Sequence, residues 1–120
     1  MESQIGFSME EQKEYWMHKI RSLAEPIRKS EYEILKTEAD IKRILAASKL
    51  KALSEGNKTV ASQEVYAENV PELYRTRLQH AVNKSNLSSL KVELEALKVG
   101  FEEWRTKMVN MREERKRYGA

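Results

Sequence analysis

The residues in this chain best suited to chemistry are its clustered lysines and arginines. Five of them surround the small-residue stretch Ala46-Ala47-Ser48, and these are Lys42, Arg43, Lys49, Lys51 and Lys58. Small side chains let the backbone of a partner approach closely, and cationic groups hold phosphates, so the pattern predicts a phosphate-contacting surface. The same composition is also typical of an ordinary solvated helix, because Lys and Ala are good helix formers.

A second cationic cluster lies near the end of the sequence, at Arg112, Arg115, Lys116 and Arg117. The net charge is only +3, but residues 19–58 carry ten Lys/Arg against six Asp/Glu, and residues 105–120 carry six against two. The remaining segments are net acidic, so contact with a polyanion is expected in these two segments. Assignment of the second cluster rests on charge alone.

Aromatic residues beside cations can stack nucleobases while the cations hold phosphates, and Trp104-Arg105 with Lys107 has this composition. Trp104 also belongs to a regular apolar pattern, so packing against another helix is the favoured interpretation for it. The five tyrosines are scattered, and most of them are expected to be half-buried.

Catalytic groups do not form a recognisable set. His18 and His80 are far apart and lack metal-ligand spacing, and the chain has no Cys. Adjacent carboxylates such as Glu102-Glu103 and Glu113-Glu114 diverge by about 100° on a helix, so they do not focus on one substrate atom. We therefore expect no enzyme activity, no cofactor and no metal.

The side chains named above are expected to lie on helices, because the apolar residues of the chain follow a helical spacing. Large apolar residues follow an unbroken spacing of three and four, which lines them along one narrow seam of a helix. They are Leu87, Leu90, Leu94, Leu97, Phe101, Trp104, Met108 and Met111. A seam this narrow indicates packing against another helix.

The first half of the chain carries a matching pattern. Ser8 to Glu11 fits a capping box, and the isoleucines that follow recur every seven residues, with the polar Ser30 and Thr37 where a coiled coil would prefer Leu. The heptad isoleucines are Ile20, Ile27, Ile34 and Ile41. Pro26 interrupts this run and predicts that the helix kinks or restarts near residues 24–26, because proline removes an amide donor and clashes with the preceding turn. A kink is the favoured outcome, since the apolar register continues across the proline.

Several signals mark where helices end and begin. Gly56-Asn57 predicts a turn near residues 55–61, Ser62 is the expected cap of the next helix, and Pro71 predicts an interruption with a renewed helix after it. The polar residues 83–89 contain no Gly or Pro, so we expect a continuous helix there.

Together these features predict an all-α fold, a long antiparallel helical hairpin or coiled coil with kinks near Pro26 and Pro71. Residues 1–7 are expected to be a disordered lead-in and residues 8–120 a single hairpin domain, in which Trp16 lies near Phe101. One hairpin cannot bury all of these apolar side chains, so a homo-oligomer is expected. The chain has no secretory signal and no apolar run of bilayer length, which favours a soluble cytoplasmic protein without membrane contact.

The order of features over residues 32–116 resembles the UvsY-type recombination mediators of tailed phages. A Lys/Ala helix (residues 44–53) leads to Gly56-Asn57, and a long helix follows with Leu90-Lys91-Val92, a later aromatic residue and Met111-Arg112. The resemblance implies an oligomeric ring that binds single-stranded DNA and contacts a RecA-like recombinase or a single-strand-binding protein. Carried over by position, the DNA-contacting residues are Lys42, Arg43, Lys49, Lys51 and Lys58.

The leading interpretation is therefore a phage-type accessory protein of the bacterial cytoplasm that binds single-stranded DNA and assists recombinase loading. The alternative is a structural or adaptor coiled-coil protein that mediates protein–protein assembly, in which the seam is the functional surface and the cations only aid solubility. A helical secretion substrate is disfavoured, because such proteins carry Trp-x-Gly where this chain has Glu-Gly-Asn-Lys at residues 55–58.

Overall fold

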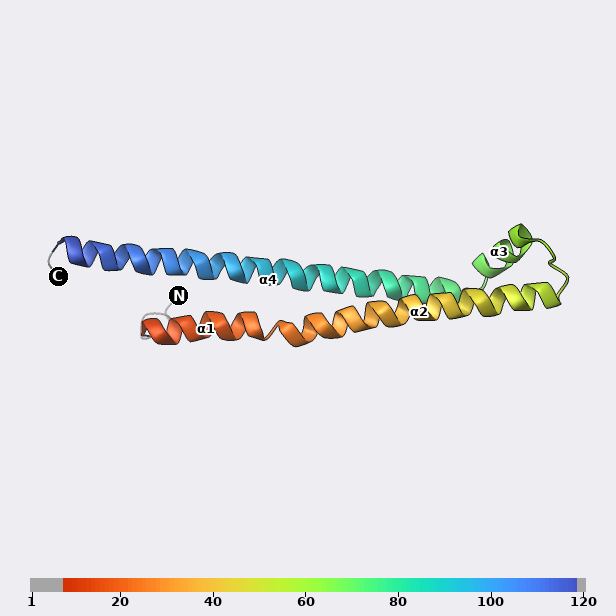
Figure 1. The fold of residues 1–120 in the computed structure, drawn as a ribbon, viewed down its shortest axis with the longest axis horizontal. Coiled ribbons are helices and arrows are strands. Elements are labelled where there is room, and N and C mark those ends of the chain that lie inside the picture. Colours follow the sequence, from red (N-terminus) through yellow and green to blue (C-terminus); the bar gives the residue numbers. More distant parts are fainter. Residues whose placement is uncertain (1–7, 119–120) are drawn as a thin grey trace. The chain divides into compact units, whose positions relative to one another are not determined.

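The computed structural model describes residues 8–118, and within them the fold is all-α, as predicted, with no β-strand. The helices are α1 (Met9–Arg21), α2 (Ala24–Ser54), α3 (Val60–Glu68) and α4 (Pro71–Arg117) (Figure 1). The expected lead-in at residues 1–7 lies outside the described residues. The chain divides into two compact units, unit 1 with residues 1–26 and 89–120, and unit 2 with residues 27–88.

Unit 1 pairs α1 with the C-terminal part of α4. The Ser8 hydroxyl accepts a hydrogen bond from the Glu11 N–H at 3.1 Å and caps α1 as predicted. Gln12 contacts Trp104, and Trp16 lies against Gly100, so the two helices are antiparallel. The expected register placed Trp16 beside Phe101, one residue from its observed neighbour.

The interruption expected at Pro26 takes a different form. The predicted kink is wrong, because α1 ends at Arg21 and α2 starts anew at Ala24. Leu23 is only 7% exposed, and its N–H donates to the Ile20 carbonyl at 3.2 Å, so the turn between the helices is anchored by a buried side chain. Pro26 then falls in the first turn of α2, where its missing N–H has no intrahelical partner to lose.

Unit 2 pairs α2 with the start of α4. Glu33 contacts Asn83 and Thr37 contacts His80, which makes this pair antiparallel as well. Its buried apolar side chains come from all three helices of the unit, and they are Ile44, Ala52, Ala67 and Leu73. The hairpin pairing predicted from the heptads is therefore present in each unit.

The turn predicted near residues 55–61 is confirmed. Gly56 has a φ of +97°, which L-residues rarely adopt, and the Asn57 N–H donates to the Ala52 carbonyl at 3.0 Å to close the end of α2. The cap of α3 is Thr59 rather than Ser62. Thr59 has extended backbone angles, and its hydroxyl accepts from the Ser62 N–H at 3.1 Å, so Ser62 lies inside the first helical turn.

The long helix α4 begins at Pro71 and continues unbroken through residues 83–89, as predicted. Pro at the first helical position has the φ angle that a helix needs and an N–H that would be unpaired in any case. The division between the two units falls within the same polar stretch, between Ser88 and Ser89.

Candidate nucleic-acid and partner-binding surfaces

The basic residues predicted to contact phosphate near Ala46 all belong to unit 2. Lys42, Arg43 and Lys51 are exposed on α2, Lys49 is half-buried there, and Lys58 is exposed in the turn that follows. Lys42 and Lys49 are seven residues apart, so they share one flank of α2 about 10 Å apart along its axis.

Arg43 differs from its lysine neighbours because it has carboxylate partners. Its guanidinium lies 3.9 Å from Asp40 and 4.0 Å from Glu72 at the start of α4. Within residues 8–118, none of the four lysines of this cluster forms an ion pair. A phosphate therefore has to compete with carboxylates of the described chain for Arg43 but not for these four ammonium groups.

The side of α2 that points away from α4 carries a row of exposed side chains that sequence reasoning missed. We name it the outer face of α2; its residues are Tyr32, Leu35, Ala39, Ala46, Leu50 and Leu53. Leu35 is 64% exposed and Leu50 69%, although both are large and apolar. Lys42 and Lys49 lie along one edge of this face, at about 40–60° from its centre line.

Tyr32 is part of the outer face and is 61% exposed. The expectation that most tyrosines are half-buried is wrong, since Tyr15, Tyr74 and Tyr118 are exposed too and only Tyr66 is half-buried. The sequence signal for this was available, because Tyr32 stands two residues from the heptad position Ile34 and therefore about 160° from the seam.

The C-terminal cations belong to unit 1 and lie on the last turns of α4. All four are exposed, and Lys116 lies 3.9 Å from Glu113. Arg112 instead turns toward α1, where its Nη2 contacts the Met9 sulfur at 3.6 Å. Arg115 lines a small depression with the same methionine, so these two arginines border an apolar surface.

A larger crevice of about 370 Å³ lies between α1 and α4 and shares Met9, Met108 and Arg112 with this depression. Apolar side chains of Met9, Phe101, Trp104 and Met108 line it together with Val109, and three cations, Lys13, Arg105 and Arg112, stand against one carboxylate, Glu10. Methionine side chains adapt to irregular partners, so the crevice has the composition of a protein-binding groove.

Phe101 and Trp104 of unit 1 are engaged in helix packing. The Trp104 Nε1–H donates to the Gln12 side-chain oxygen at 2.7 Å, and its ring stacks on Phe101 with centroids 5.9 Å apart. Arg105 lies over the Phe101 ring at 5.8 Å and is tied to Glu102 at 3.0 Å. Trp104 thus lies in the interface between α1 and α4, and the structure gives it packing contacts.

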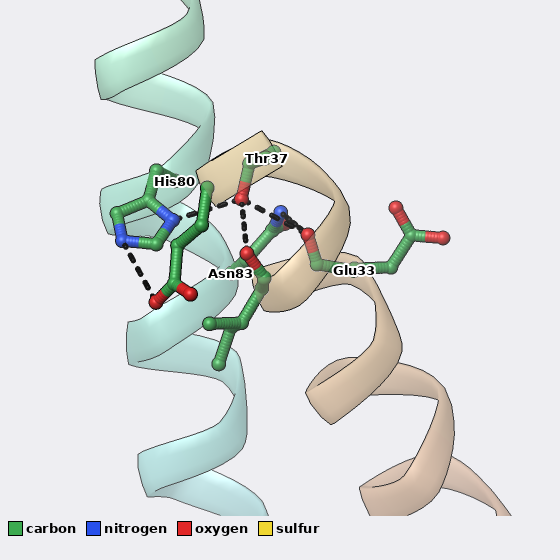
Figure 2. A network of polar contacts seen from close by, with 6 residues as sticks. Glu33, Thr37, His80 and Asn83 are labelled. Atoms are coloured by element: carbon green, nitrogen blue, oxygen red, sulfur yellow. Dashed lines mark hydrogen bonds and ion pairs between the residues drawn. The ribbon is translucent and has the colours of Figure 1, made fainter. Parts of the chain in front are cut away.

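Part of the seam of unit 2 is formed by polar side chains, at positions where a coiled coil would prefer leucine (Figure 2). The Thr37 hydroxyl lies 2.8 Å from His80 Nδ1 and within hydrogen-bond distance of the Glu33 and Ile34 carbonyls, at 2.9 and 3.0 Å. His80 Nε2 lies 3.9 Å from a carboxylate oxygen of Glu38. We name Thr37, His80 and Asn83 the polar layer.

Asn83 completes the polar layer. Its side chain is buried, its Nδ2 donates to the Glu33 carbonyl at 3.2 Å, and its Oδ1 accepts from Gln79 at 2.9 Å. Within the described chain, no buried side-chain nitrogen or oxygen lacks a hydrogen-bond partner. A satisfied polar layer of this kind fixes how two helices slide along each other, because any other register leaves buried polar groups unpaired.

The predicted packing residues all lie on half-buried positions of their helices. In the first half of the chain these are Ile20, Ile27, Ile34 and Ile41, and on α4 they are Leu90, Leu94, Leu97, Phe101, Trp104 and Met108. Met111 is 40% exposed, so the seam ends at Met108.

The two histidines belong to different units of the chain. His18 is exposed and His80 belongs to the polar layer, and within residues 8–118 no group of three or more His, Asp or Glu side chains is placed to hold a metal ion. None of the four helices as described has the length and apolarity required to cross a bilayer.

Comparisons with protein-family models, with curated proteins and with solved structures found no match to this chain.

Proposed function

We propose that this protein binds single-stranded DNA without sequence preference and assists the loading of a RecA-like recombinase. The observation that supports DNA binding most directly is the lysine row on α2, in which Lys42 and Lys49 share one flank and neither is neutralised by a carboxylate within residues 8–118. Tyr32 adds an exposed aromatic ring on the adjoining outer face, and nucleobases stack on such rings whatever their sequence.

The mechanism is electrostatic. Lysines that contact phosphates release counterions from the strand, and repeated subunits multiply sites that are individually weak. The role in recombinase loading rests on the resemblance to UvsY-type mediators. Those proteins help to load a RecA-like recombinase on single-stranded DNA in place of a single-strand-binding protein.

The test is fluorescence anisotropy of a labelled single strand of about 30 nucleotides, titrated at several salt concentrations. We expect Lys42→Glu/Lys49→Glu to weaken binding at least tenfold and to reduce the salt slope by about 1.4, since each phosphate contact on a single strand contributes about 0.7. The matched control is Lys91→Glu/Lys98→Glu, which has the same spacing on α4 and the same change in charge. Equal loss in both variants would show that only net charge matters and would contradict the assignment to α2.

The crevice in unit 1 supports a second candidate, an adaptor protein that assembles with protein partners. Its methionines and aromatic rings form an apolar floor, and the cations around it suit an acidic segment. Absence of DNA binding at low salt, together with direct binding of the chain to a recombinase or to a single-strand-binding protein, would establish this candidate in place of the first.

A further inference from the structure

The outer face of α2 carries large apolar side chains that are exposed, as on a helix face that packs against a second helix. It spans residues 32–53, about 33 Å of helix at 1.5 Å per residue, and lies opposite the seam that packs on α4. Four of its six residues are large and apolar, and each of these is at least 49% exposed. A solvated face of this length would instead carry mostly polar residues.

The spacing and the order of large and small side chains on this face are the same from either end. The spacings from Tyr32 to Leu53 are three, four, seven, four and three residues, with two large side chains at each end and two alanines inside. When a second α2 is laid antiparallel on the first, Tyr32 meets Leu53, Leu35 meets Leu50 and Ala39 meets Ala46. The residue numbers add to 85 in all three pairs, and twofold symmetry generates each pair twice.

The size of the side chains favours the same arrangement. Alanines at the centre let two helix axes approach closely, while the large residues at the ends fill the space where crossing helices diverge. A partner of unrelated sequence gives no reason for this symmetry, whereas a second copy of the same helix does.

The charges at the edge fit in part. Glu38 and Lys49 lie on the same flank, and the antiparallel register brings Glu38 of one copy within two residues of the level of Lys49 of the other. Lys42 lies beside the twofold axis, where its long stem can carry the ammonium group into water. On this flank two opposite-charge pairs therefore lie on either side of one like-charge contact between the two Lys42 side chains. On the opposite flank the two Arg43 side chains lie beside the axis and make a second like-charge contact.

From this symmetry we infer that a second copy of this chain docks on the outer face of α2, antiparallel, with Ala39 opposite Ala46. The inference does not depend on nucleic-acid binding, and its tests contain no nucleic acid.

The absence of Cys allows a direct test of the register. Full-length Ala39→Cys and Ala46→Cys proteins, tagged to differ in mass, are unfolded together, refolded and oxidised. A disulfide needs its Cα atoms within about 7 Å, so we expect the mixed disulfide, while each variant alone yields little because like residues lie about 10 Å apart along the axis. Disulfides between identical variants would indicate a parallel pair, and no disulfide in any sample would show that a second copy does not cover this face; either result overturns the inference.

A second measurement uses neighbouring alanines as a matched pair. Ala46 lies on the outer face and Ala47 about 100° around the helix, and both are exposed, so Ala46→Glu and Ala47→Glu change charge and helix propensity equally. We expect Ala46→Glu to halve the particle mass in sedimentation equilibrium and Ala47→Glu to retain the mass of the unmodified chain. Equal masses for the two variants would overturn the inference.

Discussion

Gly100 shows how one residue sets the approach of two helices. A Cβ atom at this position would lie 2.8 and 2.9 Å from two ring carbons of Trp16, closer than real contacts allow. The helix itself would favour alanine here by about 1 kcal/mol, so glycine is present in spite of helix propensity. The tight contact with Trp16 accounts for it.

We expect Gly100→Ala to destabilise the protein by about 1 kcal/mol, because overpacking a rigid ring costs about 1–3 kcal/mol and exceeds the gain in helix propensity. In a Trp16→Leu background the same change should stabilise the protein, since the ring is gone and only the propensity remains. Urea unfolding followed by circular dichroism measures both. A stabilising effect in the unmodified background would show that the ring moves aside without cost.

Thr37 supplies the hydroxyl group of the polar layer. Thr37→Val keeps the shape of the side chain but removes the hydroxyl 2.8 Å from His80 Nδ1, leaving a largely buried ring nitrogen without its partner. We expect a loss of about 1–2 kcal/mol in the free energy of unfolding.

The matching variant is Thr37→Val/His80→Leu, which replaces both partners by apolar groups and should recover most of that loss. A double-mutant cycle by urea unfolding tests this coupling. Additive effects of the two substitutions would contradict a direct interaction between the side chains.

Among the helices, α3 is stabilised by hydrogen bonds and an ion pair more than by the burial of apolar side chains. Its Glu68 accepts a bidentate hydrogen bond from Arg77 of α4, with one N–O distance of 3.1 Å, and this bond lowers the pKa of Glu68 and raises that of Arg77. Two residues earlier in α3, a hydrogen bond to Glu55 raises the pKa of the Tyr66 hydroxyl. Ala67 is the one buried side chain that α3 contributes.

These pKa directions predict how α3 responds to pH. Glu68 has a lowered pKa in the folded state, so its contribution is present above its ordinary pKa of 4.5 and is lost as the pH falls through the folded value. Tyr66 has a raised pKa, so its contribution is present below its ordinary pKa of 10.0 and is lost as the pH rises through the folded value.

We expect the amide signals of α3 to lose protection from hydrogen exchange as the pH falls below 4.5, before those of the seam of unit 2. Arg77→Gln should remove this acid dependence, because Glu68 then has no cation to lose. NMR hydrogen exchange from pH 6 to pH 3 measures it. The same acid dependence in the variant would show that another group is responsible.

Much of the fold at this scale followed from local signals. The heptad isoleucines and the 3–4 spacing of α4 located the seam, while Gly56 marked the end of α2 and Pro71 the start of α4. Pro26 allowed either a kink or a restart, because a proline is also acceptable in the first turn of a new helix. The burial of Leu23, which favours the restart at Ala24, was not visible in the sequence.

The candidate surfaces were less accessible from the sequence. The lysine row was identified, yet the ion pairs that distinguish Arg43 from Lys42 depend on which carboxylates α4 brings near. The outer face of α2 was not predicted, because the heptad isoleucines indicate one apolar face only. The second apolar row lies on the opposite side of the same helix. The crevice in unit 1 was not predictable from either helix alone, because α1 and α4 both contribute side chains to its lining.

For the whole molecule, the proposed dimer and the proposed DNA surface reinforce each other. Twofold symmetry about an axis perpendicular to both helices keeps the same flank of α2 on the same side in both copies. Lys42 and Lys49 of the two copies would then lie in one row, in which Glu38 of each copy lies near Lys49 of the other and the two Lys42 ammonium groups lie together at the centre. Such a row attracts a phosphate backbone more strongly than either copy alone.

The division into two units has a spectroscopic consequence. Both tryptophans of the chain, Trp16 and Trp104, belong to unit 1, whereas unit 2 holds only tyrosines as aromatic chromophores. Tryptophan emission therefore reports the melting of unit 1 alone, and far-ultraviolet circular dichroism reports the helices of both units. Coincident transitions in the two signals would mean that the units unfold as one cooperative block, and separated transitions would give each unit its own melting temperature.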